Sequence, residues 1–393
     1  MRILVLNADY PKFLRALYLE NPHLAAASYE AQMTVRNDSL FGVADYYSRN
    51  FRAHGYEAAE IHVNNRWMQY AWMREHGLDL AAPEPPQTQP APGKPIRQRM
   101  KALLRPLLGP LVRRMGGPYA MPAWESEVMA AQITQFRPDV ILNQEMAHID
   151  NATIKRVTPP GCVVIGQIAS PLPHDISFDA YDMVISSLPN LVGWFQSHGI
   201  EAAVNRLAFE PTILEKMGPP PSRDVDVSFV GSLSGAHTGR IRFLEQVCRN
   251  VPLKVWGNGI ESLPSTSPLH ACYQGEAWGR DMYNVLRRSR ITLNNHLDLA
   301  GKWANNLRLY EATGMGTMLL TDAKRNLADI FQPGDEVVTY DNADDCIAQI
   351  RRYMADEPAR AAIAAAGQRK AIEAQNYAGR TAEIIEFVRK LRT

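Results

Sequence analysis

The sequence predicts an α/β protein made of two doubly wound domains in tandem, each with a parallel sheet covered by helices. Short apolar runs alternate with segments of helical periodicity along almost the whole chain. Runs this apolar are typical of strands that are buried on both faces of a parallel sheet. The Pro-rich segment 218–222 divides the alternation into two series, and a length of 393 residues agrees with two domains.

The first series predicts a parallel sheet in residues 1–210. Its candidate strands are residues 2–6, 59–63, 139–143, 162–167, 183–187 and 202–206. Apolar residues at helical spacing predict a helix over residues 39–54, which Gly55 ends. Parallel sheets bind ligands at the carboxyl ends of their strands, so we expect function in the loops at 7–12, 64–67, 144–150 and 168–175.

The second series predicts another sheet of this kind, with strands at 226–230, 253–256, 291–294, 317–320 and 336–339. Helices are predicted over 237–250, 344–354, 359–374 and 379–391. A Gly/Ser loop that begins at Gly231-Ser232 separates the first of these strands from its helix. Such a loop presents backbone N–H groups and a helix N-terminus to phosphate, and Arg240 lies in the first helical turn.

Composition restricts the classes of function. A formal net charge of +1 argues against a general nucleic-acid binder, so we expect no nucleic-acid partner. The four cysteines have no metal-ligand spacing and are expected to be reduced thiols of a cytoplasmic protein, with no metal site. The first residues are too short an apolar run for a leader, and no stretch reaches the roughly 18 apolar residues of a membrane span.

An insertion at about 81–116 interrupts the first domain. Residues 81–95 hold six prolines and predict an exposed loop or linker. The segment from Lys94 to Gly116 has seven basic residues and no acid, which leaves +1 − 7 = −6 for the rest of the chain. Two interpretations stay open. The segment is a basic amphipathic helix that contacts an anionic surface, such as the inner face of the membrane, or it packs on its own domain.

Residues 305–322 organise the second domain. Two amides, Arg308 and Glu311 lie on a helix, followed by Gly314-Met315-Gly316 and an apolar strand. The guanidinium is a fixed fork that suits phosphate, and a carboxylate accepts hydrogen bonds from paired hydroxyls, so the pair suits a sugar nucleotide. The alternative is an i, i+3 salt bridge on an ordinary helix.

Several motifs of the second half recur together in a known family. They are Phe229-Val230-Gly231-Ser232, Gly257-Asn258-Gly259, Ile291-Thr292-Leu293-Asn294, the 305–322 stretch, Phe331-Gln332-Pro333-Gly334-Asp335-Glu336 and Tyr377-Ala378-Gly379-Arg380. The series, over residues 225–390, resembles the CgeB-like glycosyltransferases. These are a GT-B-fold group related to the glycosyltransferase family 1/4 superfamily. The first half resembles the family only in layout.

The resemblance implies two Rossmann-like domains that face each other across a cleft. It implies an acceptor domain at 1–210, a donor domain at 211–376 and a last helix at 377–393 that crosses back to the first domain. It places Glu311 at the donor ribose, Arg240 and Arg308 near the diphosphate, and the small or polar residues Gly231, Ser232, Gly257 and Asn306 around the nucleotide. No metal or other cofactor is implied, because protein cations and helix N-termini neutralise the leaving diphosphate.

One departure from the family pattern concerns the donor sugar. Retaining relatives often carry a glutamate eight residues before the ribose glutamate, where this chain has Trp303. We expect Lys302, Asn305 or Asn306 to replace that contact. Retention or inversion of the anomeric configuration stays open.

The chemistry also needs a general base near the acceptor hydroxyl. Candidates after the strands of the first domain are Asp9, Glu145, His148, His174 and Asp175, each of which also suits a turn, a cap or the surface. We favour Glu145 and His174 as catalytic residues, because both follow candidate central strands directly. An aromatic set, Trp67, Tyr70 and Trp72, suits either sugar stacking or core packing.

These observations predict a cytoplasmic glycosyltransferase that moves a sugar from a nucleotide-diphosphate donor to an acceptor of unknown class, whether glycan, lipid-linked, protein or small molecule. The alternatives are a GT-B-fold sugar-nucleotide epimerase or phosphorylase-type enzyme, and a non-catalytic coat or structural protein with the same fold.

Overall fold

The computed structural model describes residues 1–81, 121–170, 172, 177–233, 238–296 and 301–393. The predicted basic segment at 94–116 and the candidate base His174 lie outside these residues. All elements below belong to the described part of the chain.

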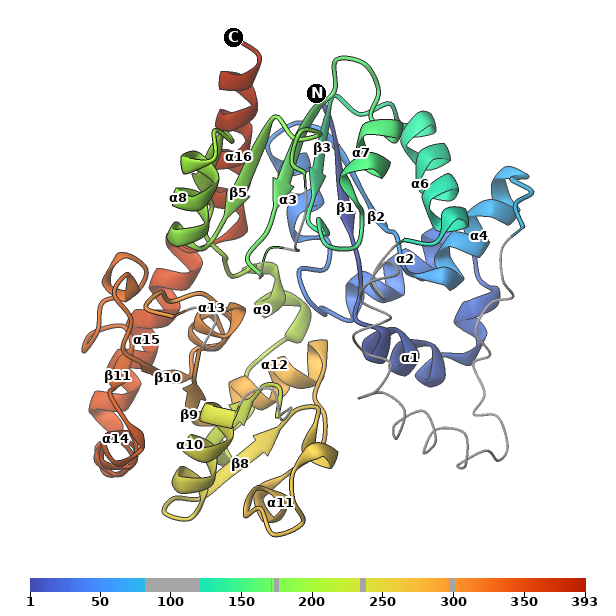
Figure 1. Cartoon of the computed structure of the whole chain (residues 1–393). Coiled ribbons are helices and arrows are strands. Elements are labelled where there is room, and N and C mark those ends of the chain that lie inside the picture. Colours follow the sequence, from blue (N-terminus) through green and yellow to red (C-terminus); the bar gives the residue numbers. More distant parts are fainter. Residues whose placement is uncertain (82–120, 171, 173–176, 234–237, 297–300) are drawn as a thin grey trace.

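The N-terminal domain contains a six-stranded sheet in the order β2-β1-β3-β4-β5-β6 (Figure 1). Every neighbouring pair is parallel. Alternate residues of β1 explain why both faces are covered: Ile3 and Val5 pack toward α3 and α16, while Leu4 and Leu6 pack toward α6 and α7. The strands are β1 (Arg2–Asn7), β2 (Glu57–His62), β3 (Val140–Asn143), β4 (Val163–Gln167), β5 (Met183–Ser186) and β6 (Ala202–Val204).

The helices of this domain cover both faces of the sheet and its carboxyl edge (Figure 1). They are α1 (Pro11–Glu20), η1 (Pro22–Ala26), α2 (Tyr29–Asp38), α3 (Tyr46–Ala53), α4 (Arg66–His76), α6 (Ala123–Phe136), α7 (Asn151–Val157) and α8 (Pro189–Ser197).

The C-terminal domain has a five-stranded parallel sheet in the order β11-β10-β9-β7-β8. Its strands are β7 (Val225–Val230), β8 (Leu253–Trp256), β9 (Ser289–Asn294), β10 (Met318–Asp322) and β11 (Val338–Tyr340). Its helices are α9 (Thr212–Met217), α10 (Thr238–Cys248), η2 (Ile260–Ser262), α11 (Leu269–Cys272), α12 (Gly279–Arg288), α13 (Leu307–Gly314), η4 (Leu327–Asp329), α14 (Ala343–Ala355) and α15 (Glu357–Glu373). The last helix, α16 (Tyr377–Leu391), packs on the N-terminal domain.

The predicted doubly wound sheets are confirmed, but the predicted helix over 39–54 is wrong in its first half. The helix begins only at Tyr46, and residues 39–45 form a loop. Leu40, Gly42 and Ala44 in this loop have φ values of 60°, 62° and 39°, so the backbone cannot continue a right-handed helix there. The apolar periodicity of the loop reflects its packing against the core rather than a helix, since Leu40 and Ala44 are fully buried.

Both sheets share a strand order that creates a crevice at one point of the carboxyl edge. In each sheet the first strand lies between the second and the third, so β1/β3 and β7/β9 are the two switch points. Connections leave these adjacent strands in opposite directions, which opens a space for a ligand between the loops. Ala8 and Glu145 follow β1 and β3, while Gly231 and Asn295 follow β7 and β9.

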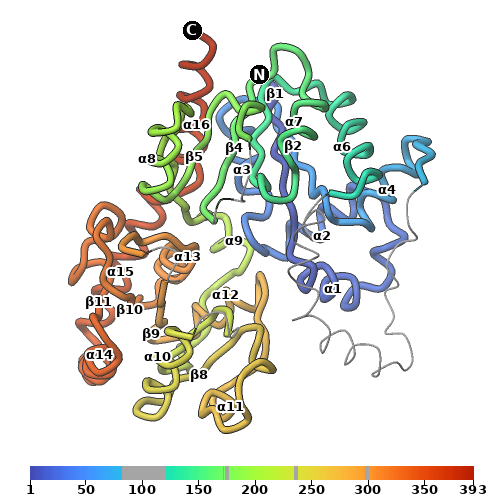
Figure 2. The backbone as a smooth tube through the Cα atoms, viewed as in Figure 1, coloured from blue at the N-terminus to red at the C-terminus, as the bar shows by residue number. Residues whose placement is uncertain are grey.

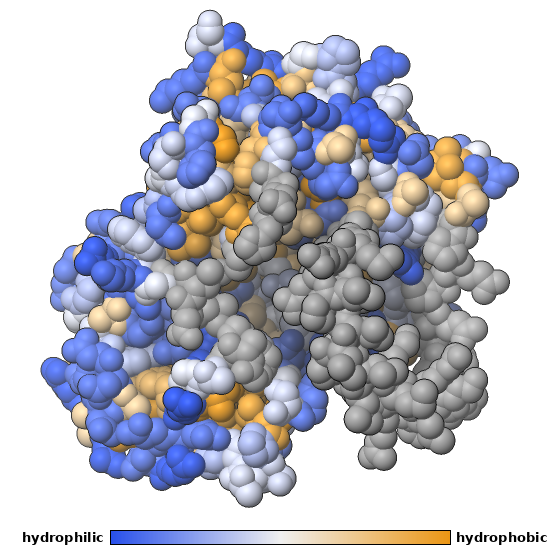
Figure 3. Space-filling model, viewed as in Figure 1, coloured by the Kyte–Doolittle hydropathy of each residue, from blue (hydrophilic) through white to orange (hydrophobic). Residues whose placement is uncertain are grey.

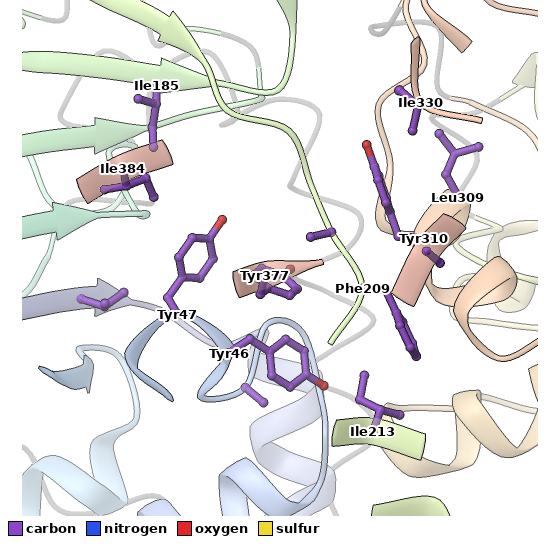
Figure 4. Close-up of a cluster of buried hydrophobic side chains, with 14 of the residues drawn as sticks. Tyr46, Tyr47, Ile185, Phe209, Ile213, Leu309, Tyr310, Ile330, Tyr377 and Ile384 are labelled. Carbon is purple, nitrogen blue, oxygen red and sulfur yellow. The ribbon is translucent and has the colours of Figure 1, made fainter. Parts of the chain in front are cut away.

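A shared hydrophobic core joins the two domains. The chain crosses between them twice, before α9 and before α16, and the two crossings pair through Phe209 N–H to Gln375 O at 2.8 Å (Figure 2). Tyr377 lies at the junction, with its ring 5.2 Å from those of both Tyr46 and Tyr47 of the N-terminal domain (Figure 4). On its other side lie Phe209, Tyr310 and their neighbours, and α16 then packs on α3.

A second contact between the domains lies at the start of α12. Arg280 N–H donates to Ser39 O at 2.9 Å, and the Arg280 guanidinium donates to Asp38 O at 2.6 Å. Gly279 has a φ of 48°, and a Cβ there would lie 2.0 Å from Ser39 O. Glycine is therefore needed at 279 for this docking, both for its backbone conformation and for its lack of a side chain.

The surface is mainly hydrophilic at the rim of the face in Figure 3, where blue side chains dominate and orange ones gather toward the middle. Within the described ranges, no helix has the length and apolar character to cross a membrane.

The docking at Gly279 can be tested by substitution. We expect Gly279→Ala to lower the free energy of unfolding by about 1–3 kcal/mol more than Gly275→Ala, measured by urea denaturation. Gly275 is a matched control because its φ is also positive, at 104°, but nothing lies within 4 Å of a Cβ there. Equal losses in the two variants would show that the contact with Ser39 does not hold the domains together.

Candidate functional site

A cavity of about 660 Å³ lies where the two switch points face each other. Both domains line it, which is expected if loops at the carboxyl ends of both sheets bind one ligand. The residues are Asn7, Ala8, Asp9, Tyr10, Arg36, Phe41, Gly42, Val43 and Glu145 from the N-terminal domain, and Phe229, Val230, Gly231, Ser232, Arg240, Gly257, Asn258, Ala277, Trp278, Gly279, Met282, Asn294, Asn295, Asn305, Asn306, Leu307, Arg308 and Glu311 from the C-terminal domain.

The seven residues predicted to surround the nucleotide therefore lie together, on one wall of one cavity. They come from the loop after β7, the start of α10, the loop after β8 and the first turns of α13. Glu145, one of the two favoured bases, lines the opposite wall. The other, His174, lies outside the described residues, as does Asp175.

Two glycines of this wall are in backbone contact. Gly231 N–H donates to Trp256 O at 3.0 Å, and a Cβ on Gly257 would lie 1.8 Å from Gly231 O. The loops after β7 and β8 are thus as close as two backbones allow. Because these glycines have no side chains, the cavity stays open here, and a ligand can approach the backbone closely.

Arg240 ties together the loops after β7 and β9. Its guanidinium donates to Ser232 O at 3.4 Å and to Asn295 O at 2.5 Å, and it lies 5.7 Å from the centre of the Phe229 ring. These bonds hold the cation at the cavity wall, where sequence reasoning expected an anion contact.

The two amides before α13 have different roles. Asn306 caps the helix, with its side-chain oxygen 3.3 Å from Leu309 N and its amide nitrogen 2.6 Å from Asn294 Oδ1. The Asn305 Oδ1 atom is buried and accepts no hydrogen bond from the described residues, although Asn305 lines the cavity. Of the three replacements considered for the missing donor-sugar contact, Asn305 is the one with a free acceptor at the cavity, while Lys302 is exposed.

Arg308 and Glu311 form the i, i+3 ion pair that sequence spacing allowed, at 2.8 Å. The pair also lines the cavity, so the salt-bridge and ligand interpretations are compatible. Arg308 Nε donates to Val230 O at 3.3 Å, and its buried Nη1 is the atom that lies 2.8 Å from Glu311 Oε2. Burial raises the pKa of Glu311, although Arg308 and Tyr283 oppose this effect. A ligand with phosphate and hydroxyl groups would satisfy both side chains.

Glu145 follows β3 and is positioned by its own backbone, whose N–H donates to Asn143 Oδ1 at 2.9 Å. Burial raises the pKa of its carboxyl group to about 7, and the Asp9 carboxylate adds to this effect while His148 opposes it. A carboxylate with a pKa near 7 is a much better proton acceptor than an ordinary one. Glu145 also lines a smaller cavity of about 280 Å³.

Sequence reasoning missed a buried charge network next to the cavity. Asp9 is 3% exposed and accepts hydrogen bonds from Arg36, while His62 Nδ1 lies 3.2 Å from Asp9 Oδ2. Burial opposes ionisation of Asp9, but Arg36 and His62 hold its pKa well below the ordinary value. Asp9, a candidate base by sequence, is therefore a paired anion and a weak proton acceptor. This pair was missed in the sequence because Asp9 and Arg36 lie far apart along the chain.

The remaining sequence candidates have structural roles. His148 Nε2 lies 3.6 Å from Glu125 Oε2, and neither residue lines the larger cavity. In the same loop, Asp150, which was not a candidate, caps α7 by accepting a bond from Thr153 N at 2.7 Å. Trp67 and Trp72 are 8% and 7% exposed and pack in the core, so the core interpretation of these aromatics is confirmed.

The aromatic residues at the cavity are others: Tyr10, Phe41, Phe229 and Trp278. The rings of Tyr10 and Trp278 lie edge-on to Phe41, with centroids at 5.6 and 5.5 Å, so the set joins both domains. The position of Tyr10, after β1, was a usable signal, because every strand-end loop was expected to face the ligand. No sequence signal placed Phe41 or Trp278 at the ligand site, since Phe41 was assigned to a helix and Trp278 lies far from any strand end.

The Asp9–Arg36 pair gives a stability prediction. We expect Arg36→Met to lower the free energy of unfolding by about 3–5 kcal/mol, because it leaves a buried carboxylate unpaired. Arg74→Met is the control, since Arg74 pairs with Glu75 at 3.8 Å and is 57% exposed, which predicts a loss of at most about 1 kcal/mol. A loss from Arg36→Met no larger than that of the control in urea denaturation would contradict the network.

Comparisons with known proteins agree with this geometry. Residues 240–386 match the model of a family described as glycosyl transferase-like, from α10 almost to the end of α16. The narrower likeness to CgeB-like enzymes stays a prediction. A comparison with curated proteins finds no match to the sequence.

Solved structures match over the whole chain at low identity. Sucrose-phosphate synthase from Thermosynechococcus elongatus matches with a TM-score of 0.57 at 11% identity, covering 100% of this chain and 99% of that one. HepE of Anabaena in complex with UDP-glucose matches with a TM-score of 0.57 at 11% identity, over 99% and 100% of the chains. AviGT4, a glycosyltransferase involved in avilamycin A biosynthesis, matches with a TM-score of 0.53 at 16% identity, over 100% and 98%. The chain therefore has the GT-B fold of two facing α/β domains.

Proposed function

We propose that this protein is a glycosyltransferase that moves a sugar from a nucleotide-diphosphate donor to a hydroxyl of an acceptor. One observation carries the proposal. A single cavity at the facing switch points holds the Arg308–Glu311 pair on one wall and Glu145 on the other. The family match over residues 240–386 and the complexes of HepE with UDP and UDP-glucose support a nucleotide sugar as donor.

The donor diphosphate lies at the N-terminus of α13, between Arg308 and Arg240. The unpaired backbone N–H groups of the first helical turn and the helix dipole favour an anion there. The Arg308 guanidinium, whose Nη1 lies 2.8 Å from Glu311 Oε2, adds a positive charge at the same place. These groups neutralise the charge that develops on the leaving diphosphate, so the proposal assigns this role to the protein without a metal.

The ribose and the transferred sugar occupy the two sides of this anion site. Glu311, one turn into α13, accepts hydrogen bonds from the ribose hydroxyls with the carboxylate oxygen that Arg308 leaves available. Asn305, just before the helix, directs its free Oδ1 at a hydroxyl of the transferred sugar. In this scheme Asn305 replaces the contact that Trp303 cannot make.

Glu145 is the general base. Its carboxylate accepts the proton of the acceptor hydroxyl, whose oxygen then forms the new bond to the anomeric carbon. Its raised pKa suits the task, because a base is most effective when its pKa lies near the working pH. Asp9 cannot replace it, since Arg36 and His62 stabilise the Asp9 anion.

The donor site is tested by nucleotide binding. We expect Arg308→Gln to weaken UDP at least about tenfold in isothermal titration calorimetry, because a buried charged hydrogen bond is lost. GDP, ADP and dTDP are titrated alongside, since the geometry does not select a base. Arg288→Gln is the control, because Arg288 pairs with Asp224 at the surface of the same domain. Nucleotide affinity that stays unchanged in Arg308→Gln would refute the donor assignment.

The catalytic assignment is tested by the pH dependence of transfer, followed as consumption of labelled donor. The native rate should rise with pH and level off above about 7, because the base must be deprotonated. Glu145→Gln should lower the rate about 10²- to 10⁴-fold while UDP binding is retained. A native profile without this limb, or a variant with full activity, would show that another group accepts the proton.

Glu145 also gives a stability prediction of known sign. Its folded-state pKa lies above the unfolded value of 4.5, so the native state holds the proton more tightly and loses stability as the pH rises from about 4.5 to 7. We expect Glu145→Gln to be more stable than the native protein by about 1–3 kcal/mol at pH 8, with the difference disappearing near pH 4. Equal melting temperatures at pH 8 would contradict the raised pKa.

A further inference from the structure

We propose that the acceptor is a neutral saccharide, whose ring lies on Tyr10 beside Glu145 and whose further hydroxyls reach Gln144. The inference rests on the proposed function and names the class of its second substrate. It is carried by an exposed aromatic ring, a free amide oxygen and the charges of the N-terminal wall.

Tyr10 is unusually exposed for an aromatic residue inside a cavity. Its side chain is 65% exposed, the highest value among the large hydrophobic residues that the structure describes. Phe41 holds one edge of the ring at 5.6 Å and is itself stacked on Phe13 at 3.9 Å. The ring is thus held in place by Phe41, while most of its surface stays exposed at the cavity. The weakly positive C–H groups of a sugar ring pack well on such a negative π face.

The ring of Tyr10 lies close to the proposed base. Tyr10 and Glu145 follow the adjacent parallel strands β1 and β3, where Leu6 is paired with Asn143. Both residues line the larger cavity. A hydroxyl bound at Glu145 therefore places the ring that carries it over Tyr10.

The smaller cavity continues from Glu145 on the far side of β3. Gln144, Gln167 and Ser170 line it. The Gln144 amide donates to Gln167 Oε1 at 2.7 Å, and Gln167 in turn donates to Tyr47 Oη at 2.8 Å, which fixes both amides. The buried Gln144 Oε1 atom accepts no hydrogen bond from the described residues, so a hydroxyl of the acceptor can donate to it.

The charges of this wall favour a neutral acceptor. Arg36 is the cation that the described N-terminal residues contribute to the larger cavity, and Asp9 neutralises it. The smaller cavity has no described cation in its lining. Among the described residues of this wall, an anionic acceptor would therefore lie beside Glu145 without a counter-charge, which is unfavourable. A neutral sugar, which carries hydroxyl groups but no charge, can bind to the same wall without this cost.

The transfer step balances without another reactant. The acceptor oxygen forms a bond to the anomeric carbon, and the bond from that carbon to the diphosphate oxygen breaks. The electron pair leaves with the nucleoside diphosphate, and the hydroxyl proton passes to Glu145.

Binding of simple sugars tests the acceptor class without knowledge of the natural acceptor. Saturation-transfer NMR is recorded on the native protein with saturating UDP and, in turn, methyl β-glucoside, cellobiose, maltose, glucuronate and glucose 6-phosphate. We expect transfer to at least one neutral sugar and none to the two anions. Tyr10→Ala should weaken that sugar about five- to tenfold, and Tyr10→Phe, which keeps the ring, should not. Gln144→Leu should weaken it as well.

Calorimetry with UDP on the same variants separates this inference from the proposed function. UDP affinity should stay within about twofold in Tyr10→Ala, because the ring lies on the acceptor wall. Binding of no neutral sugar, preference for the anions, or equal loss of UDP and sugar in Tyr10→Ala would overturn the inference. Failure of the native protein to bind any nucleotide would instead count against the donor site.

Discussion

The burial of Tyr377 between the two domains is the contact on which the rest of the structure depends. Its ring packs on Tyr46 and Tyr47, and the adjacent backbone pairs with Phe209 where the chain first leaves the N-terminal domain. The two crossings are therefore fixed to each other, and one continuous core runs from β1 to β10. Together with the docking of the start of α12 on Ser39, this contact makes the crevices of the two sheets face each other.

Burial and pairing give two carboxylates of the N-terminal wall opposite properties. Asp9 and Glu145 follow adjacent strands and line the same cavity. Arg36 and His62 keep Asp9 ionised, while Glu145 has no comparable cation among the described residues and its pKa rises to about 7. The ion pair of Asp9 with Arg36 stabilises the N-terminal wall, and the charge of Asp9 further raises the pKa of Glu145. Different environments often give two neighbouring carboxylates different pKa values, so that one of them can act as a base near neutral pH.

Much of this could be predicted from the sequence. Buried strands such as β3 and β7 are short apolar runs whose pattern is local, and the Arg308–Glu311 spacing lies within one helix. The loop at 39–45 could not be predicted, because its apolar residues face a core that exists only after the domains have packed. The Asp9–Arg36 pair and the contact of Gly279 with Ser39 join residues distant in sequence, and charge or glycine content alone does not reveal such partners.

The central claim is that the cavity between the switch points binds a nucleotide sugar. The most direct test is a thermal-shift screen of the native protein with UDP-, GDP-, ADP- and dTDP-sugars, since a ligand that binds only the folded state raises its stability by mass action. The account predicts that at least one of these donors raises the melting temperature by several degrees. No shift with any donor at millimolar concentration would contradict it.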